Sequence, residues 1–363
     1  MATVSLCMIV KNEEAVLARC LDSIREGVDE INIVDTGSSD KTKKIALRYT
    51  DRVFDFEWTD DFSAARNFSF SKATMDFAMW LDADDVFTKE NLEAFIQMKQ
   101  TIPDTADVIM MRYNTAFDEN DKPVFSYYRE RLIRRSIPFE WKGRVHEAIV
   151  HTGRAMYTDV AVNHKSIKTV YSDRNLRIYE KQEASGEPFT PRDIFYYARE
   201  RYYHKQYDRA IEMLKKFLSD GAGWIENNIE ACKILSYCHR ETGNLTEAIS
   251  DLCISFRYDT PRAEICCEIG NLWMRLQNYR TAAFWYELAR IIPRKDKSGA
   301  FISEDCHGYL PCIQLCVCYD KLGNREKAEE YNRLAGTFRP SSPAYLQNLE
   351  YFKRVSPHSP NHL

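Results

Sequence analysis

The chain has 363 residues, of which 44% are hydrophobic, and its 50 Lys and Arg residues nearly balance 54 Asp and Glu residues, for a formal net charge of −4. This length favours two domains, and the charge excludes a globally basic protein of the kind drawn to nucleic acid. No apolar run approaches the roughly 20 residues that span a bilayer. No basic signal region precedes the first strand-like run, so we expect a cytoplasmic protein without membrane insertion.

The first half alternates strand and helix patterns. Short apolar runs indicate strands, and apolar residues at intervals of three and four indicate helices. This order predicts an α/β domain with a mostly parallel sheet covered by helices on both faces. The expected strands are residues 4–10, 30–35, 51–58, 80–81, 108–113 and 131–135, and the expected helices are 12–25, 41–49, 62–77 and 173–185.

The second half is helical and repetitive. A short segment ending in alanine recurs four times, and twelve residues before each alanine stands a small residue. A period near 34 residues of paired helices, with small residues where helices pack closely, resembles the tetratricopeptide repeat. We therefore expect two domains, 1–190 and 191–355. The alanines are Ala210, Ala248, Ala282 and Ala328, and the small residues are Ala198, Ser236, Gly270 and Cys316.

The 11 cysteines fall mostly within these repeats. Cys232, Cys266 and Cys312 hold the same position in successive repeats, which favours a role as small buried hydrophobes. A zinc site is the alternative, but the paired C-x-x-C spacing of zinc ribbons and knuckles is lacking.

Three carboxylates follow the apolar run 77–81. Asp82, Asp84 and Asp85 would lie at the C-terminal end of a buried strand, where open α/β sheets bind ligands. An Asp-x-Asp there suits a divalent cation that carries a phosphate ligand. The alternative is a surface turn with a helix N-cap.

Four segments in order carry a family resemblance. Residues 8–14, 33–42, 62–67 and 80–85 resemble the successive motifs of family 2 glycosyltransferases with a GT-A fold. The resemblance covers roughly residues 3–170. With the repeats behind it, the chain is similar to bacterial family 2 enzymes fused to tetratricopeptide repeats, including the peptide S-glycosyltransferases of glycopeptide bacteriocins.

This resemblance implies a donor site and a metal site. The nucleotide of a UDP-sugar would lie along Ile9, Val10, Lys11, Glu13, Asp35 and Arg66, and the donor would also meet Asp82 and Ala83. Asp84 and His164 would bind Mn²⁺ or Mg²⁺, with Asp85 either supporting them or capping a helix. Taken alone, each residue favours a structural interpretation: Asp35 as a turn residue, Arg66 as a solvated helix charge and His164 as a structural histidine.

An inverting transfer needs a general base on the acceptor side. Many family 2 members place it in a Glu-Asp dipeptide, whereas this chain has His146-Glu147, as its repeat-fused relatives do. Glu147 is our candidate and His146 its rival, and a structural His–Glu pair is the alternative. Arg129, Arg131 and Arg135 would share one face of a strand and steady the leaving pyrophosphate, or would simply protect an edge strand.

The sequence thus predicts an inverting, metal-dependent transfer of a hexose from a UDP-sugar to a peptide or protein side chain. The repeats would present a concave surface for that acceptor or for a homodimer. Two alternatives stay open: a lipid or surface saccharide as acceptor, and a non-catalytic scaffold with a degenerate nucleotide-binding module.

Overall fold

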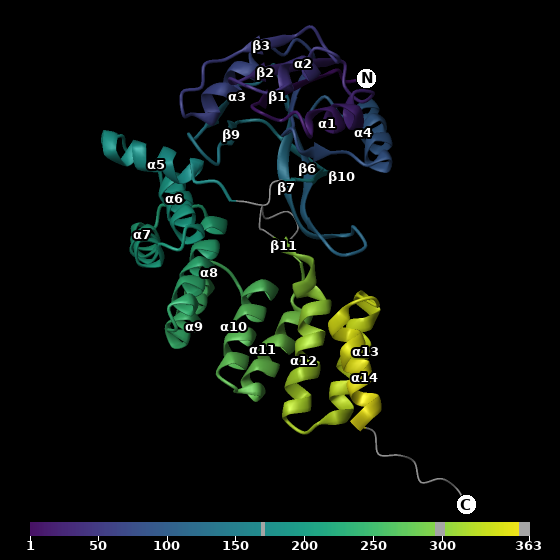
Figure 1. Cartoon of the computed structure of the whole chain (residues 1–363), viewed down its shortest axis with the longest axis vertical. Coiled ribbons are helices and arrows are strands. Elements are labelled where there is room, and N and C mark those ends of the chain that lie inside the picture. The colour runs from purple at the N-terminus through teal and green to yellow at the C-terminus, as the bar shows by residue number, and fades with distance from the viewer. Residues whose placement is uncertain (168–170, 295–301, 356–363) are drawn as a thin grey trace, which may run out of the picture. The chain divides into compact units, whose positions relative to one another are not determined.

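The structure of the protein is a computed structural model that describes residues 1–167, 171–294 and 302–355. These residues form two compact units, Met1–Glu200 and Arg201–Leu363 (Figure 1). The expected domain boundary near residue 190 stays a prediction. Helix α6 begins at Pro191 and runs to Tyr203, past the end of the first unit at Glu200.

The first unit alternates strands with helices. Its elements are β1 Val4–Val10, α1 Leu17–Ile24, β2 Glu30–Asp35, α2 Thr42–Ala46, β3 Val53–Asp55, α3 Phe62–Phe70, β4 Phe77–Trp80, β5 Asp85–Val86, α4 Lys89–Thr101, β6 Val108–Phe117, β7 Pro123–Arg134, β8 Phe139–Lys142, β9 Ala148–His151, β10 Ala155–His164, α5 Arg174–Ser185 and α6 Pro191–Tyr203.

The main sheet is mixed and mostly parallel, as the sequence predicts. Its strands follow the order β3-β2-β1-β4-β7-β6-β10-β5. The four strands from β3 to β4 are parallel, β7 runs antiparallel to both β4 and β6, and β10 is parallel to β6. The hairpin β8-β9 forms a separate two-stranded sheet.

Apolar side chains cover both faces of this sheet. Alternate residues of a strand point to opposite faces, and on β1 the side chain of Met8 joins a core cluster with α1, α2 and α4, whereas Cys7 joins a second cluster with α3, β8 and β9. Burial on both faces explains why β1 reads as a continuous apolar run.

Several element boundaries differ from the sequence prediction. Helix α1 begins at Leu17 rather than at residue 12, because Asn12 has a left-handed backbone with φ of 55°. Helix α3 ends at Phe70, since the chain must turn before β4 begins at Phe77. The elements β5, α4, β8 and β9 were not among the expected ones.

The second unit is built from consecutive helix pairs. Its elements are α7 Tyr207–Asp220, α8 Ile225–Glu241, α9 Leu245–Ile254, η1 Ser255–Arg257, α10 Ala263–Arg275, α11 Tyr279–Ile291, β11 Ile302–Ser303, η2 Glu304–His307, α12 Tyr309–Lys321, α13 Arg325–Phe338 and α14 Pro343–Val355. Helices α8 and α9, α10 and α11, and α12 and α13 pack as pairs.

The repeat pattern coincides with the helix contacts. The recurring alanines lie in the first turn of α7, α9, α11 and α13, and all of them are buried. At the small position of α10, a Cβ atom added to Gly270 would lie 2.9 Å from the ring of Tyr286. Small side chains therefore stand where neighbouring helices approach closely.

The cysteines belong to this packing. Every cysteine except Cys253 is buried, and Cys232, Cys266 and Cys312 occupy the interior sides of α8, α10 and α12. Burial raises the pKa of the Cys266 thiol to about 12, so it stays a neutral, hydrophobic group. Across the described part of the chain, no helix has the length and apolar character needed to cross a membrane.

Candidate functional site

The candidate site lies where β1, β2 and β4 end. These strands are parallel neighbours, so their C-terminal ends share one edge of the sheet. The ends of β1 and β2 are joined because the backbone N–H of Thr36 donates to the carbonyl of Val10 over 2.9 Å. Open α/β sheets bind ligands at this edge.

Asp35 is a turn residue with one carboxylate oxygen left over. One carboxylate oxygen, Oδ1, accepts hydrogen bonds from the backbone N–H groups of Gly37 at 2.9 Å and Ser38 at 2.8 Å, which forms the turn. The other oxygen, Oδ2, is buried and has no hydrogen-bond partner among the described residues. A buried acceptor without a donor is costly, and a ligand N–H or hydroxyl group would satisfy it.

The loop after β1 lies beside the loop after β2. Ile9 is partly buried, Val10 is buried and Lys11 is exposed. The backbone N–H of Glu13 donates to Oγ1 of Thr42 at 2.7 Å. The predicted nucleotide-binding residues of the first motif therefore lie next to the turn that Asp35 makes.

Arg66 connects the two sides of the site. It lies on α3 and is 6% exposed. Its Nη2 donates to Oδ1 of Asp82 at 2.7 Å, and its Nε donates to Oε1 of Glu147 at 2.6 Å. Although burial opposes ionisation of Asp82, the guanidinium of Arg66 holds the pKa of that carboxyl below its usual value. The structure thus brings together three of the predicted residues from distant parts of the sequence.

The ring of Trp80 contacts several arginine side chains beside this network. The guanidinium groups of Arg66, Arg129 and Arg131 lie 4.8, 4.9 and 3.8 Å from the centre of its ring. Arg66 also lies 4.9 Å from the ring of Trp141. Aromatic faces stabilise cations by their quadrupole, so the indole allows several guanidinium groups to crowd at the end of β4.

The acidic run after β4 meets the end of β10. Nδ1 of His164 lies 3.2 Å from Oδ1 of Asp85 and 3.4 Å from Oδ1 of Asp84. Although burial opposes protonation, the hydrogen bond with Asp85 raises the pKa of His164 above its usual value. This site therefore favours a positive charge, whether a proton or a metal ion supplies it.

Asp85 anchors this corner of the site. Its side chain is fully buried. Oδ1 accepts a hydrogen bond from the hydroxyl of Tyr113 at 2.9 Å, and Oδ2 accepts one from Nη1 of Arg131 at 3.2 Å and one from the backbone N–H of Asp82 at 3.0 Å. With its oxygens committed in this way, Asp85 supports its neighbours rather than reaching outward.

The donor set fits a divalent cation. Asp84, Asp85 and His164 form a group of metal-ligand atoms that all lie within 4.8 Å of one another. Carboxylate oxygens suit Mg²⁺ and Mn²⁺, and an added imidazole favours Mn²⁺. Asp84 and His164 are partly exposed, so they are the members that an incoming ion can reach.

Glu147 and His146 point to different partners. Glu147 binds Arg66, whereas Nε2 of His146 lies 2.8 Å from Oε1 of Glu200 on α6. The imidazole also stacks on the ring of Tyr196. Burial lowers the pKa of His146. Of the two candidate bases, the one that lies with the site network is Glu147.

Arg135 does not lie with the other predicted donor residues. Strand β7 ends at Arg134, and Nη1 of Arg135 donates to the carbonyl of Met75 at 2.8 Å, just before β4 begins. This is the opposite end of β4 from Asp82. The structure therefore gives no support to a donor contact by Arg135.

Ala83, another of the predicted donor residues, is buried within the acidic run.

Sequence reasoning missed Tyr113 and Arg174, and it named the arginines of β7 without their actual contacts. Tyr113 and Arg131 hold Asp85, and Arg129 stacks on Trp80. Arg174, at the start of α5, stacks on Phe62, the first residue of α3, and burial lowers its pKa. The arginines of β7 were singled out as a cluster, but no sequence signal pointed to Tyr113 or Arg174.

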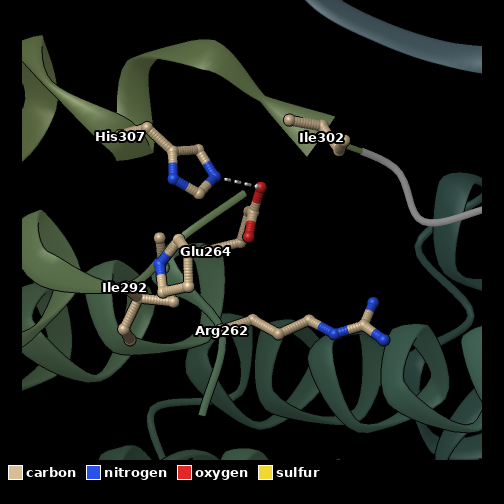
Figure 2. Close-up of a pocket in the computed structure, with 7 residues that line it drawn as sticks. Arg262, Glu264, Ile292, Ile302 and His307 are labelled. Carbon is tan, nitrogen blue, oxygen red and sulfur yellow. Dashed lines mark ion pairs between the residues drawn. The ribbon is translucent and has the colours of Figure 1, made fainter. Parts of the chain in front are cut away.

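The second unit contains a pocket of its own. It is lined by Arg262, Glu264, Ile292, Ile302 and His307 among others (Figure 2). Figure 2 shows Glu264 directed toward His307 and Arg262 directed away from it. Nε2 of His307 lies 3.5 Å from Oε1 of Glu264. Arg262 forms ion pairs with Glu226 and Asp259 instead. These charged groups are paired with one another, which favours a structural role.

Comparisons with known proteins agree with this architecture. Residues 5–160 match the family model described as glycosyl transferase family 2. A TPR repeat-containing protein of Synechococcus elongatus is 41% identical over 117 residues, which are 32% of this chain and 28% of that protein. The SPbeta prophage-derived glycosyltransferase SunS of Bacillus subtilis is 26% identical over 231 residues, which are 60% of this chain and 54% of SunS. The chain thus spans about half the length of SunS and less of the Synechococcus protein.

Matches to solved structures are distant. YrrB, described as a TPR protein with an unusual peptide-binding site, has a TM-score of 0.37 at 16% identity and covers 49% of this chain and 83% of that one. Glucosyl-3-phosphoglycerate synthase from Mycobacterium tuberculosis, in complex with Mg²⁺ and UDP, has a TM-score of 0.27 at 21% identity and covers 31% of this chain and 44% of that one.

Proposed function

Because the chain joins a family 2 glycosyltransferase domain to tetratricopeptide-type repeats, we propose that it is an inverting, metal-dependent enzyme that moves a hexose from a UDP-sugar to a peptide or protein side chain. We place this activity in the cytoplasm, where the buried thiols stay reduced. The observation that carries the proposal is the network in which the buried Arg66 joins Asp82 to Glu147 beside Asp84 and His164.

On the donor side, the unpartnered Oδ2 of Asp35 would accept a hydrogen bond from the uracil N–H or a ribose hydroxyl. Asp84 and His164 would hold the divalent cation, which would neutralise the charge of the leaving UDP. Asp82, kept ionised by Arg66, would face the donor sugar.

On the acceptor side, Glu147 would take the proton of the attacking side chain. The lone pair freed on the nucleophile forms the bond to C1 of the sugar while the bond from C1 to the phosphate oxygen breaks. UDP leaves with the electron pair of the broken C1–O bond, and the configuration at C1 inverts. His146 is committed to Glu200 and Tyr196, which favours Glu147 as the base.

The repeats would select the acceptor. Tetratricopeptide-type helices stack into concave surfaces that bind extended partners, and the second unit of this chain has paired helices of this kind. This property supports a peptide or protein acceptor, and the same surface is proposed to serve a homodimer.

The test is release of UDP from UDP-glucose, UDP-galactose and UDP-N-acetylglucosamine by the full chain with Mn²⁺. We expect turnover of at least one donor, its loss on chelation, and a decrease of roughly 10²-fold or more in Asp84→Asn. The control is Asp104→Asn, an exposed carboxylate in the turn that follows α4. A radiolabelled donor then separates peptide acceptors from lipid or saccharide acceptors.

Turnover that persists unchanged in Asp84→Asn would contradict the proposed metal site. If no common UDP-sugar is consumed and none binds, the scaffold alternative replaces the enzyme.

A further inference from the structure

We propose that Glu200 is a positioning residue for Glu147, and that it acts through His146 to fix the turn that directs the Glu147 carboxylate into the site. This inference rests on the proposed function. It gives a role to α6, a helix that lies outside the four sequence motifs of residues 8–85.

The turn in question is short and conformationally demanding. It joins β8 to β9, whose last facing pair is Lys142 and Ala148. Two residues within it have left-handed backbones, Gly143 with φ of 103° and His146 with φ of 52°. Glycine adopts this region freely, but a histidine stays there only where its surroundings hold it.

Side chains of α6 hold His146 in several ways. Its Nε2 lies 2.8 Å from Oε1 of Glu200. Its ring stacks on that of Tyr196, with centroids 4.4 Å apart and planes at 19°. Its backbone carbonyl accepts a hydrogen bond from Nε of Arg192 at 3.0 Å. The strained residue is therefore fixed on its ring edge, its ring face and its main chain by one helix.

The hydrogen-bond partners of His146 also indicate which ring nitrogen carries its proton. Nη2 of Arg199 lies 3.4 Å from Nδ1 of His146, and a guanidinium can only donate. Nδ1 is therefore the acceptor, and Nε2 carries the proton that it donates to Glu200. A neutral imidazole agrees with the burial that lowers the pKa of His146.

Glu200 is well placed for this task. It is fully buried, and besides His146 it accepts hydrogen bonds from the hydroxyl of Tyr171 at 2.6 Å and from Nδ2 of Asn175 at 3.3 Å. A carboxylate fixed from three sides in the interior can orient the imidazole closely.

The consequence reaches the next residue. With the ring of His146 turned toward α6, the side chain of Glu147 accepts the hydrogen bond from Arg66 at 2.6 Å. Releasing His146 would relax the left-handed turn and displace this carboxylate. A displacement of about 1 Å in a reacting group costs roughly 10²-fold in rate.

The test compares Glu200→Ala with Glu200→Gln in the full chain, with Mn²⁺ and whichever of the three UDP-sugars is consumed. We expect kcat to fall by roughly 10- to 10²-fold in Glu200→Ala, while the affinity for UDP, measured by calorimetry, changes by less than about twofold, because Asp35 is untouched. Glu200→Gln should retain most of kcat, since its amide oxygen accepts the proton of Nε2.

The matched control is Asp193→Asn. Asp193 is another buried carboxylate of α6, and it accepts hydrogen bonds from the backbone N–H and the hydroxyl of Thr190. This variant should lower the unfolding temperature and leave kcat unchanged. Where Glu200→Ala does not fold, Glu200→Asp keeps the charge but shortens the reach, and the same loss of kcat is expected.

Three results would overturn the inference: an unchanged kcat in Glu200→Ala, an equal loss of kcat and UDP affinity, or the same loss of kcat in Asp193→Asn. Absence of donor turnover in the unmodified chain would instead refute the proposed function itself, so the two failures are distinguishable.

Discussion

Arg66 shows how one residue can organise two carboxylates. Its guanidinium donates to Asp82 through Nη2 and to Glu147 through Nε, while Trp80 and Trp141 flank it. A planar fork of fixed donors can do this, whereas a lysine ammonium is a single point of charge on a flexible stem.

We therefore predict that Arg66→Lys lowers the rate of UDP release by roughly 10²-fold and destabilises the fold by about 2 kcal/mol, since one buried carboxylate loses its charged partner. Arg144→Lys is the control, because Arg144 pairs with the partly exposed Glu187 and such pairs contribute about 0–1 kcal/mol. Kinetic assays and thermal unfolding measure both effects. Equal losses in the two variants would contradict the role given to Arg66.

The sequence named the candidate-site residues that lie in motifs and the arginines of β7, but it did not predict where strand geometry places those arginines. Alternation would place Arg129, Arg131 and Arg135 on one face of a strand. The pairing of β6 with β7 shifts register at Arg131, because Ile109 faces Leu132 and Met110 faces Glu130. A bulge of this kind re-aims side chains, and β7 ends before Arg135. A register shift leaves no mark in the local sequence.

At the scale of elements, close packing between helices depends on single small side chains. Gly270 lies in α10, where helix propensity alone would favour alanine by about 1 kcal/mol. A Cβ atom at this position would lie 2.9 Å from two ring atoms of Tyr286, which is itself buried. Overpacking of a core costs about 1–3 kcal/mol, so we expect the steric effect to exceed the gain in propensity.

Gly270→Ala should accordingly lower the free energy of unfolding by about 1 kcal/mol, measured by urea denaturation. Ser236→Ala makes a change of similar size at the equivalent position of α8, where a larger group than glycine is already present, and it should be nearly neutral. A stabilised Gly270→Ala would show that Tyr286 can move aside.

The repeat pattern predicted these helices well because it is long and periodic. The boundaries in the first unit were less predictable, since they depend on tertiary geometry. Asn12 breaks the expected first helix through a left-handed backbone, and the edge strand β5 is two residues long. Such features arise from the way neighbouring elements meet rather than from local propensity.

At the scale of the whole molecule, most of α6, from Pro191 to Glu200, belongs to the compact unit that contains the site. Tyr197 of α6 stacks on the fully buried Tyr179 of α5, and its hydroxyl donates to Glu183 at 2.7 Å. Glu200 binds His146. A fragment that ends before α6 would expose these partners.

We predict that a fragment of residues 1–190 unfolds at a lower temperature than a fragment of residues 1–206. Loss of at least about 2 kcal/mol of aromatic burial corresponds to about 4–8 °C for a domain of this size. Thermal unfolding by circular dichroism measures the difference. Equal unfolding temperatures would favour a domain boundary near residue 190.

The burial of the cysteines has a practical consequence. Of the 11 cysteines, Cys253 on α9 alone is exposed, and the others are held within the cores. A thiol-reactive fluorophore or spin label therefore has a natural single point of attachment on the repeats. The unmodified chain can in this way be used to test the proposed binding of an acceptor through its own α9, without the removal of any native cysteine.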